Sequence, residues 1–156
     1  MNSTAKRFCA VILLLITFAL LIFIWGNSLM SRQLSHLQSE AALQAISPLV
    51  DSMTLSGLTE PMLRKIAHFT EFFAVSASLT LLLRLFRPTS PQLIFNCLSL
   101  GLMIAVVDES LQIISARGPL VSDILLDFCG VIAGTVFSLV VASICEKVLR
   151  KRFSSF

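Results

Sequence analysis

Four long apolar runs alternate with shorter polar segments along the chain. The runs cover about residues 8–26, 64–83, 93–114 and 120–145. A helix needs roughly 20 apolar residues to cross the hydrocarbon core of a bilayer, and each run is about that long. The pattern predicts an all-α membrane protein in which a single domain, residues 1–156, forms a bundle of four transmembrane helices.

Residues 27–62, between the first two runs, are the one sizeable segment outside the predicted spans. Leu34, Leu37 and Ala41 belong to a partly helical apolar pattern, which Pro48 interrupts. One interpretation is a short amphipathic helix that lies on the outer membrane surface. The other is a structured loop that packs against the bundle, and the pattern does not separate the two.

Composition supports the membrane assignment. Hydrophobic residues make up 56% of the chain and charged residues only 13%, whereas a soluble domain is typically about 25% charged. The net charge of +3 does not indicate nucleic-acid binding, because the basic residues flank apolar runs and form no stripe with aromatics.

The cysteines have no CxxC or CxxH spacing, so we expect buried apolar side chains without a disulfide or zinc site. They are Cys9, Cys97, Cys129 and Cys145.

The first run follows Lys6 and Arg7, as the apolar part of a secretory signal peptide would. It is too long for that apolar part, however, and residues 27–31 lack an A-x-A cleavage site. We therefore interpret it as a retained span whose N-terminus is in the cytoplasm.

The basic residues test this orientation, since cytoplasmic loops carry more lysine and arginine than outer loops. Eight basic residues would be cytoplasmic: Lys6, Arg7, Arg84, Arg87, Lys147, Arg150, Lys151 and Arg152. Four would be outside: Arg32, Arg64, Lys65 and Arg117. The distribution predicts a multi-pass protein of the cytoplasmic membrane with both termini in the cytoplasm.

The acidic residues have the opposite distribution. Glu146 alone is on the predicted cytoplasmic side. The others lie in outer loops or outer halves of spans: Glu40, Asp51, Glu60, Glu71, Asp108, Glu109, Asp123 and Asp127. Ionisable groups in a membrane usually face a bundle interior or a water-filled cavity, where they have partners. We expect a polar layer that is reached from outside the cell.

On the second span, Arg64, His68 and Glu71 are spaced i, i+4 and i+7. At about 100° per residue, they share one helix face. His68 can accept or donate a proton near neutral pH, and Glu71 can orient it. The alternative is a buried histidine that neighbours on its own helix satisfy.

On the third span, Asp108 and Gln112 are i, i+4 neighbours, while Asp108 and Glu109 are adjacent. Adjacent helical positions point about 100° apart, so the two carboxylates cannot serve one small centre equally. We expect one to face the second span and the other the fourth span or the outer surface. The alternative is a solvated helix end.

On the fourth span, Asp123 and Asp127 continue into Gly130 and Gly134 on the same face. The G-x-x-x-G spacing allows a neighbouring helix to approach closely, which would draw both aspartates into the bundle. Arg117, in the short loop before this span, could clamp a phosphate or carboxylate. It could equally fix the loop through a salt bridge to an acidic neighbour.

These residues resemble the pattern of the VanZ-like family of small bacterial membrane proteins. The similar segments are Arg64 to Phe72, read as R-K-x-A-H-F-x-E-[YF]; Asp108 to Gln112, read as D-E-x-x-Q; Arg117; and Asp123 to Gly130, read as D-x-x-x-[ND]-x-x-G. The segment of residues 27–31 is similar to a serine-rich stretch of the family. Asp127 stands where the family more often has asparagine, and Phe72 where it more often has tyrosine. The resemblance implies a four-helix domain in a bacterial membrane and a link to resistance against the glycopeptide teicoplanin.

The leading hypothesis is a polar pocket that binds the head group of a membrane lipid or cell-wall precursor. The candidate ligand-binding residues are Arg64, Lys65, Gln112, Arg117, Asp123 and Asp127, and the acid–base candidates are His68, Glu71, Asp108 and Glu109. The alternative is an intramembrane transferase or hydrolase that uses these acid–base groups. No resident cofactor is expected, although His68, Glu71 and an aspartate could hold Mg²⁺ or Mn²⁺. A structural or partner-binding role and a transporter also remain open. Four spans leave little room for a transport pathway, although a homo-oligomer could provide one.

Overall fold

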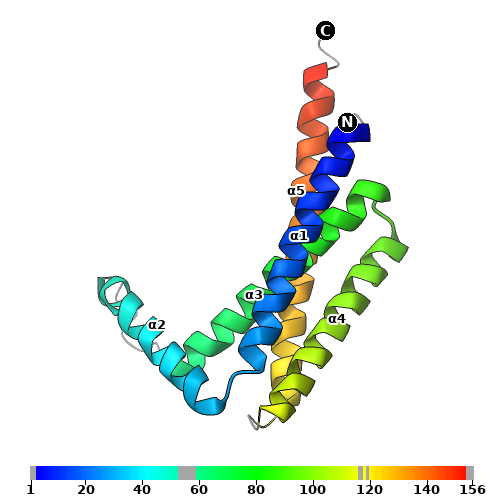
Figure 1. Cartoon of the computed structure of the whole chain (residues 1–156). Coiled ribbons are helices and arrows are strands. Elements are labelled where there is room, and N and C mark those ends of the chain that lie inside the picture. The colour runs from blue at the N-terminus through cyan, green and yellow to red at the C-terminus, as the bar shows by residue number, and fades with distance from the viewer. Residues whose placement is uncertain (1–2, 53–58, 116–117, 119, 154–156) are drawn as a thin grey trace.

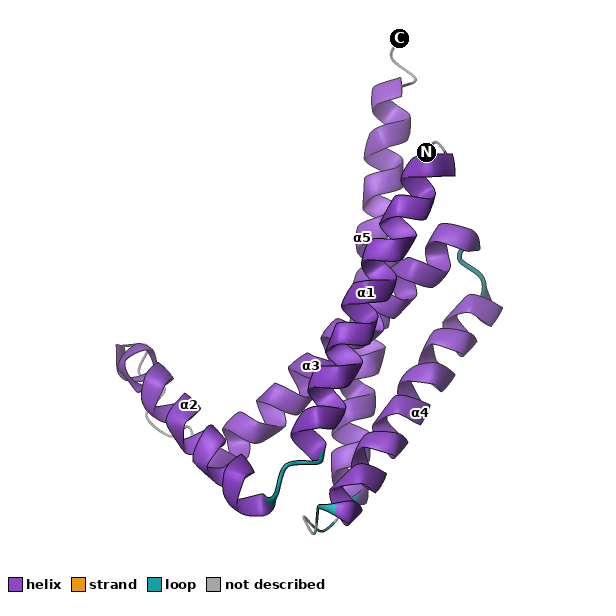
Figure 2. Ribbon diagram, viewed as in Figure 1, coloured by secondary structure: helices purple, strands orange, loops and turns teal. Residues whose placement is uncertain are grey.

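A computed structural model describes residues 3–52, 59–115, 118 and 120–153. These residues form helices and their connections, with no strand among them (Figure 2). The helices are α1 (Ser3–Ser28), α2 (Arg32–Ser52), α3 (Glu60–Phe86), α4 (Pro91–Ile114) and α5 (Val121–Phe153) (Figure 1).

Four helices are long and apolar enough to cross a membrane: α1, α3, α4 and the part of α5 at Val121–Val148. The predicted four-helix membrane protein is confirmed. The helices extend beyond the apolar runs, because helical hydrogen bonding continues into the polar residues at their ends. α3 begins at Glu60 rather than near Arg64, and α5 continues past Cys145 to Phe153.

The spanning helices run alternately up and down, so α1 begins and α5 ends at the same end of the bundle (Figure 1). α3 packs most extensively against α5, while α1 packs on α3, and α4 packs on α5. The end of α1, the end of α4 and the start of α5 lie together at the opposite end. This arrangement brings the polar ends of three spans into one layer.

The α3–α5 interface depends on small residues. A Cβ atom on Gly130 would lie 2.5 Å from the carbonyl oxygen of Phe69, and one on Gly134 would collide with that of Phe73. Hydroxyl groups stabilise the same interface: Ser76 Oγ donates to the Val131 carbonyl at 2.9 Å. The close helix approach that G-x-x-x-G predicts is therefore confirmed, and α3 is the partner.

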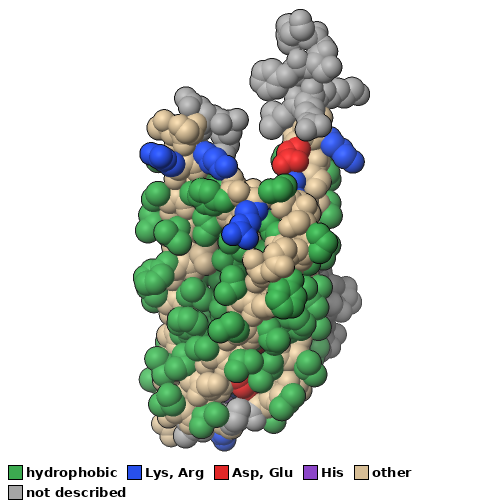
Figure 3. Space-filling view, turned by 90° about the vertical axis from the view of Figure 1, so that its right-hand side faces the viewer, with side chains coloured by type: hydrophobic (Ala, Val, Ile, Leu, Met, Phe, Trp, Pro, Cys, Tyr) green, Lys and Arg blue, Asp and Glu red, His purple; other side chains and the backbone are tan. Residues whose placement is uncertain are grey.

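The protein core is narrow and the outer surface is apolar. Ile24, Phe72, Val75, Ala105 and Val131 form the buried cluster. Large hydrophobic side chains cover the middle of the bundle, as Figure 3 shows, which suits contact with lipid. The expectation of four buried cysteines holds only for Cys97. Cys9 is partly buried, and Cys129 and Cys145 are exposed. A cysteine behaves as a small apolar residue, so the outer surface of a membrane helix also accommodates it.

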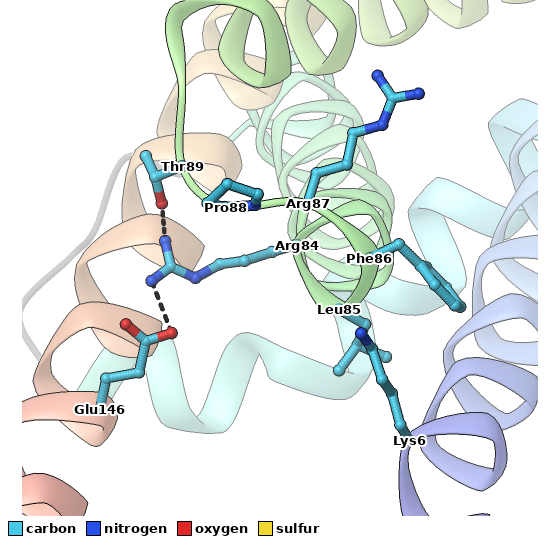
Figure 4. Close-up of a pocket in the computed structure, with 8 residues that line it drawn as sticks. All are labelled: Lys6, Arg84, Leu85, Phe86, Arg87, Pro88, Thr89 and Glu146. Carbon is cyan, nitrogen blue, oxygen red and sulfur yellow. Dashed lines mark hydrogen bonds and ion pairs between the residues drawn. The ribbon is translucent and has the colours of Figure 1, made fainter. Parts of the chain in front are cut away.

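The end that carries both termini is basic (Figure 3). Arg84, in the last turn of α3, donates a hydrogen bond to Thr89 and lies 3.0 Å from a carboxylate oxygen of Glu146 (Figure 4). The Lys6 ammonium lies 5.4 Å from the centre of the Phe86 ring. These contacts fasten α1, α3 and α5 together at this end. Its assignment to the cytoplasm stays a prediction from the basic residues.

The segment between the first two spans forms the helix α2, so the loop interpretation is wrong. The helix continues through Pro48, where we expected a break. Proline cannot donate to the carbonyl four residues earlier, and here the Ser47 hydroxyl donates to that carbonyl, of Gln44, at 2.8 Å. Leu34 and Leu37 are exposed, and their contact with a membrane surface stays a prediction.

We expect Gly134→Ala to destabilise the bundle and Gly26→Ala to leave it intact. The added methyl group at position 134 would collide with the α3 backbone, whereas a Cβ atom at position 26 has nothing within 4 Å. Overpacking of this kind lowers the free energy of unfolding by about 1–3 kcal/mol. Detergent-solubilised protein unfolded by heat or by sodium dodecyl sulfate would measure the difference, and equal stability of the two variants would contradict this packing.

Candidate functional site

Buried polar side chains gather at the end of the bundle opposite the termini. Asp108 and Asp127 are fully buried, Glu109 is 3% exposed and Gln112 is 6% exposed. Asp108, Glu109 and Gln112 belong to α4, and Asp127 belongs to α5. His68 of α3 lies beside them. Groups from segments far apart in the sequence therefore meet in one desolvated layer, which we call the polar layer.

Asp108 is held from two sides. Its Oδ1 atom accepts a hydrogen bond from the Ser28 hydroxyl of α1 at 2.6 Å, and its Oδ2 atom accepts one from the Gln112 amide at 3.2 Å. Nδ1 of His68 lies 4.0 Å from the same Oδ2 atom. The i, i+4 spacing of Asp108 and Gln112 thus produces a direct contact. The carboxylate has a fixed orientation toward α3.

Asp127 approaches the same imidazole nitrogen, with 3.6 Å between Oδ1 and the His68 Nδ1 atom. Neither carboxylate oxygen has a hydrogen-bond partner within the part of the chain that the structure describes. One ligand atom each of His68, Asp108 and Asp127 lies within 4.8 Å of the others. Three helices thus contribute one cluster, in which Asp127 has the least hydrogen bonding.

Glu109 contacts the segment that leads into α5. Its Oε1 atom accepts a hydrogen bond from the backbone N–H of Leu120, 2.6 Å away, immediately before α5. Adjacent carboxylates of α4 therefore serve different helices, Asp108 toward α3 and Glu109 toward α5, as their positions predict. This contact assigns Glu109 a role in holding the start of α5.

Arg64, His68 and Glu71 line one cavity of about 230 Å³ between α1, α2 and α3. The prediction that they share a helix face is confirmed. Glu71 accepts a hydrogen bond from the Asn27 amide at 3.4 Å, so its polar contact is with α1. We call this space the first cavity.

A second cavity of about 330 Å³ lies beside the first. Arg64 lines both cavities, and the second also has Arg32, His36, Gln112 and Asp123 on its walls. The Arg64 guanidinium lies 3.3 Å from Glu60 through Nη2, while its buried Nε atom has no hydrogen-bond partner among the described residues. Arg64 therefore has donor capacity that one carboxylate does not use.

Two of the predicted site residues are not placed in this arrangement. Lys65 is exposed and is not among the residues lining either cavity. Arg117 lies outside the described residues. Sequence reasoning had assigned no role to Asn27 and Ser28. The signal that could have found them is a polar pair at the end of the first apolar run, on the same side as the acidic residues.

The polar layer combines two kinds of chemistry. An imidazole nitrogen beside two carboxylates can take part in proton transfer or in binding a cation. An arginine with spare donors on a cavity wall can hold a phosphate or a carboxylate. The buried carboxylates and the arginine-lined cavities are therefore two chemically different parts of this end of the bundle.

The family comparison agrees with the motifs. The VanZ/LLP1 family model matches residues 8–142, which include each residue of the polar layer. Neither the comparison with curated proteins nor that with solved structures gives a match. Because the family match covers most of the 156 residues, this membrane protein belongs to the VanZ/LLP1 family.

Proposed function

We propose that the protein binds the phosphate-bearing head group of a membrane lipid or lipid-linked cell-wall precursor. The observation that carries the proposal is that Arg64 lines both cavities. Arginine recognises phosphate through paired, charge-assisted hydrogen bonds. A bound phosphate would accept hydrogen bonds from the Arg64 N–H groups that do not contact Glu60.

The lining of the first cavity suits an amphipathic ligand. Phe23 and Leu63 are apolar, whereas Asn27, Ser35 and Gln38 offer polar groups. A lipid would place its glycerol or sugar portion against the polar groups and its acyl or prenyl chain along the apolar ones. Ligand sites commonly combine an apolar wall with a few polar groups that fix orientation.

The polar layer would face the extracytoplasmic side of a bacterial cytoplasmic membrane. The basic end of the bundle supports this orientation through the excess of arginine and lysine on cytoplasmic ends. A head group of the outer leaflet would then be the ligand within reach. The resemblance to the VanZ-like family connects such a site to teicoplanin resistance, which we propose as its cellular consequence.

An intramembrane transferase or hydrolase is the second candidate. The observation that favours it is the short distance from His68 Nδ1 to Asp127 Oδ1, 3.6 Å, beside the first cavity. A carboxylate can hold an imidazole in the orientation that a general base needs.

Arg64→Gln should weaken the binding of a short-chain phosphatidylglycerol about 10–100-fold, since hydrogen bonds to charged groups contribute about 1.5–3 kcal/mol. Lys65→Gln is the matched control, because it removes the same charge from the adjacent, exposed position. Native mass spectrometry of the purified protein would measure both affinities. Equal losses in the two variants would refute a specific role for Arg64. In cells, Arg64→Gln alone should increase teicoplanin susceptibility.

The proposed orientation can be tested by labelling engineered cysteines. In a protein without its four native cysteines, Glu40→Cys on α2 should react with a membrane-impermeant maleimide added to intact cells. Lys147→Cys, at the far end of α5, should react only after the membrane is permeabilised. Both positions are exposed. The reverse labelling pattern would show that the polar layer faces the cytoplasm.

If the enzyme candidate holds, purified protein should alter the head group of a supplied lipid, and His68→Asn should abolish the reaction while lipid binding persists. Phosphorus NMR of the lipid would follow the change. Unchanged lipid after prolonged incubation with the folded wild-type protein would exclude this reaction for the lipid tested.

A further inference from the structure

We infer that His68, Asp108 and Asp127 form a binding site for a divalent cation. Each residue offers one ligand atom, and these atoms lie within 4.8 Å of one another. The three side chains belong to α3, α4 and α5, so the bound cation would join three spans. The inference is independent of the head-group proposal, which depends on Arg64.

The distances suit a small cation after a slight contraction. Zinc binds nitrogen and oxygen ligands at about 2.0–2.2 Å, so two ligands of a tetrahedral site are about 3.4 Å apart. Here, Nδ1 of His68 lies 3.6 Å from Asp127 Oδ1 and 4.0 Å from Asp108 Oδ2. The three atoms lie within 4.8 Å of one another, so side-chain movements of about 1 Å would bring them to the separation that a tetrahedral site needs.

Burial of Asp127 is the independent observation that indicates a ligand. Its side chain is 1% exposed, and within the described chain neither oxygen has a hydrogen-bond partner. An ionised carboxylate is costly to bury unless it is paired or coordinates a metal. A protonated His68 carries one positive charge and would neutralise the negative charge of only one of the two aspartates. A divalent cation would neutralise both.

The surroundings of Asp108 resemble the outer shell of a metal site. Ser28 donates to Oδ1 and Gln112 to Oδ2, which fixes the carboxylate plane. Outer-shell hydrogen bonds of this kind orient metal ligands and increase metal affinity. One imidazole nitrogen with two carboxylate oxygens is a donor set suited to Zn²⁺ or Mn²⁺.

The ligand set differs from the sequence expectation of His68, Glu71 and one aspartate. Glu71 accepts a hydrogen bond from Asn27 of α1, and the second aspartate takes its place beside the imidazole. Since His68 also lines the first cavity, the cation would lie next to that cavity. Water or a substrate atom could reach the remaining coordination position from there.

The test is metal binding by the purified full-length protein in detergent, without added lipid. The protein should carry His36→Ala, because His36 lies 3.5 Å from Glu40 and 3.3 Å from Glu60 and could bind zinc at the surface. After chelator treatment, Zn²⁺ and Mn²⁺ are titrated separately by calorimetry. We expect one equivalent of at least one of these ions to bind.

Asp127→Asn should weaken this binding at least 100-fold. Asp123→Asn, which removes a carboxylate one turn earlier on the same helix, should retain the affinity. Ser28→Ala leaves all three ligands in place and should weaken binding about 10–100-fold through the lost outer-shell hydrogen bond. It keeps the test decisive if Asp127→Asn fails to fold.

Absence of binding by the parent protein, or equal affinity in the parent and Asp127→Asn proteins, would overturn the inference. So would unchanged affinity in Ser28→Ala. Arg64→Gln should bind the metal normally even though it loses phosphatidylglycerol. The metal site and the head-group site can therefore fail separately.

Discussion

The close packing of α3 against α5 is the constraint on which the rest of the structure depends. Gly130 and Gly134 leave no room for side chains between the helices, and Ser76 and Thr135 join them with a 2.8 Å hydrogen bond. In a bilayer, helix association gains little from the hydrophobic effect, so small residues and hydroxyl pairs carry much of it. This contact sets the rotation of α5 that directs Asp127 toward His68.

The same pair of helices separates two different polar environments. At one end, Arg84 and Glu146 form an ion pair in which Glu146 remains largely exposed. At the other end, Asp108 and Asp127 are buried, and a charged carboxylate there requires a partner. The first end can be solvated beside the membrane surface, whereas the second encloses its charges. The charges that need a buried partner therefore lie at the end opposite the termini.

Much of the site could be predicted from helical periodicity. The shared face of Arg64, His68 and Glu71 follows from their spacing, and so does the divergence of Asp108 from Glu109. Periodicity does not give distances between different helices, so the pairing of Glu71 with Asn27 and the contribution of Ser28 were missed. The predicted break at Pro48 was also wrong. The hydroxyl of the preceding Ser47 replaces locally the hydrogen bond that proline cannot form.

The sequence by itself determined the all-α membrane architecture, the four spans and the family, because long apolar runs and spaced motifs are properties of the chain alone. Only the tertiary structure decided that Asp108 and Asp127 both lie near the His68 imidazole, and that Arg64 lines two cavities. The physical reason is that helix rotation and crossing depend on packing between spans, and a rotation by one position redirects a side chain by about 100°.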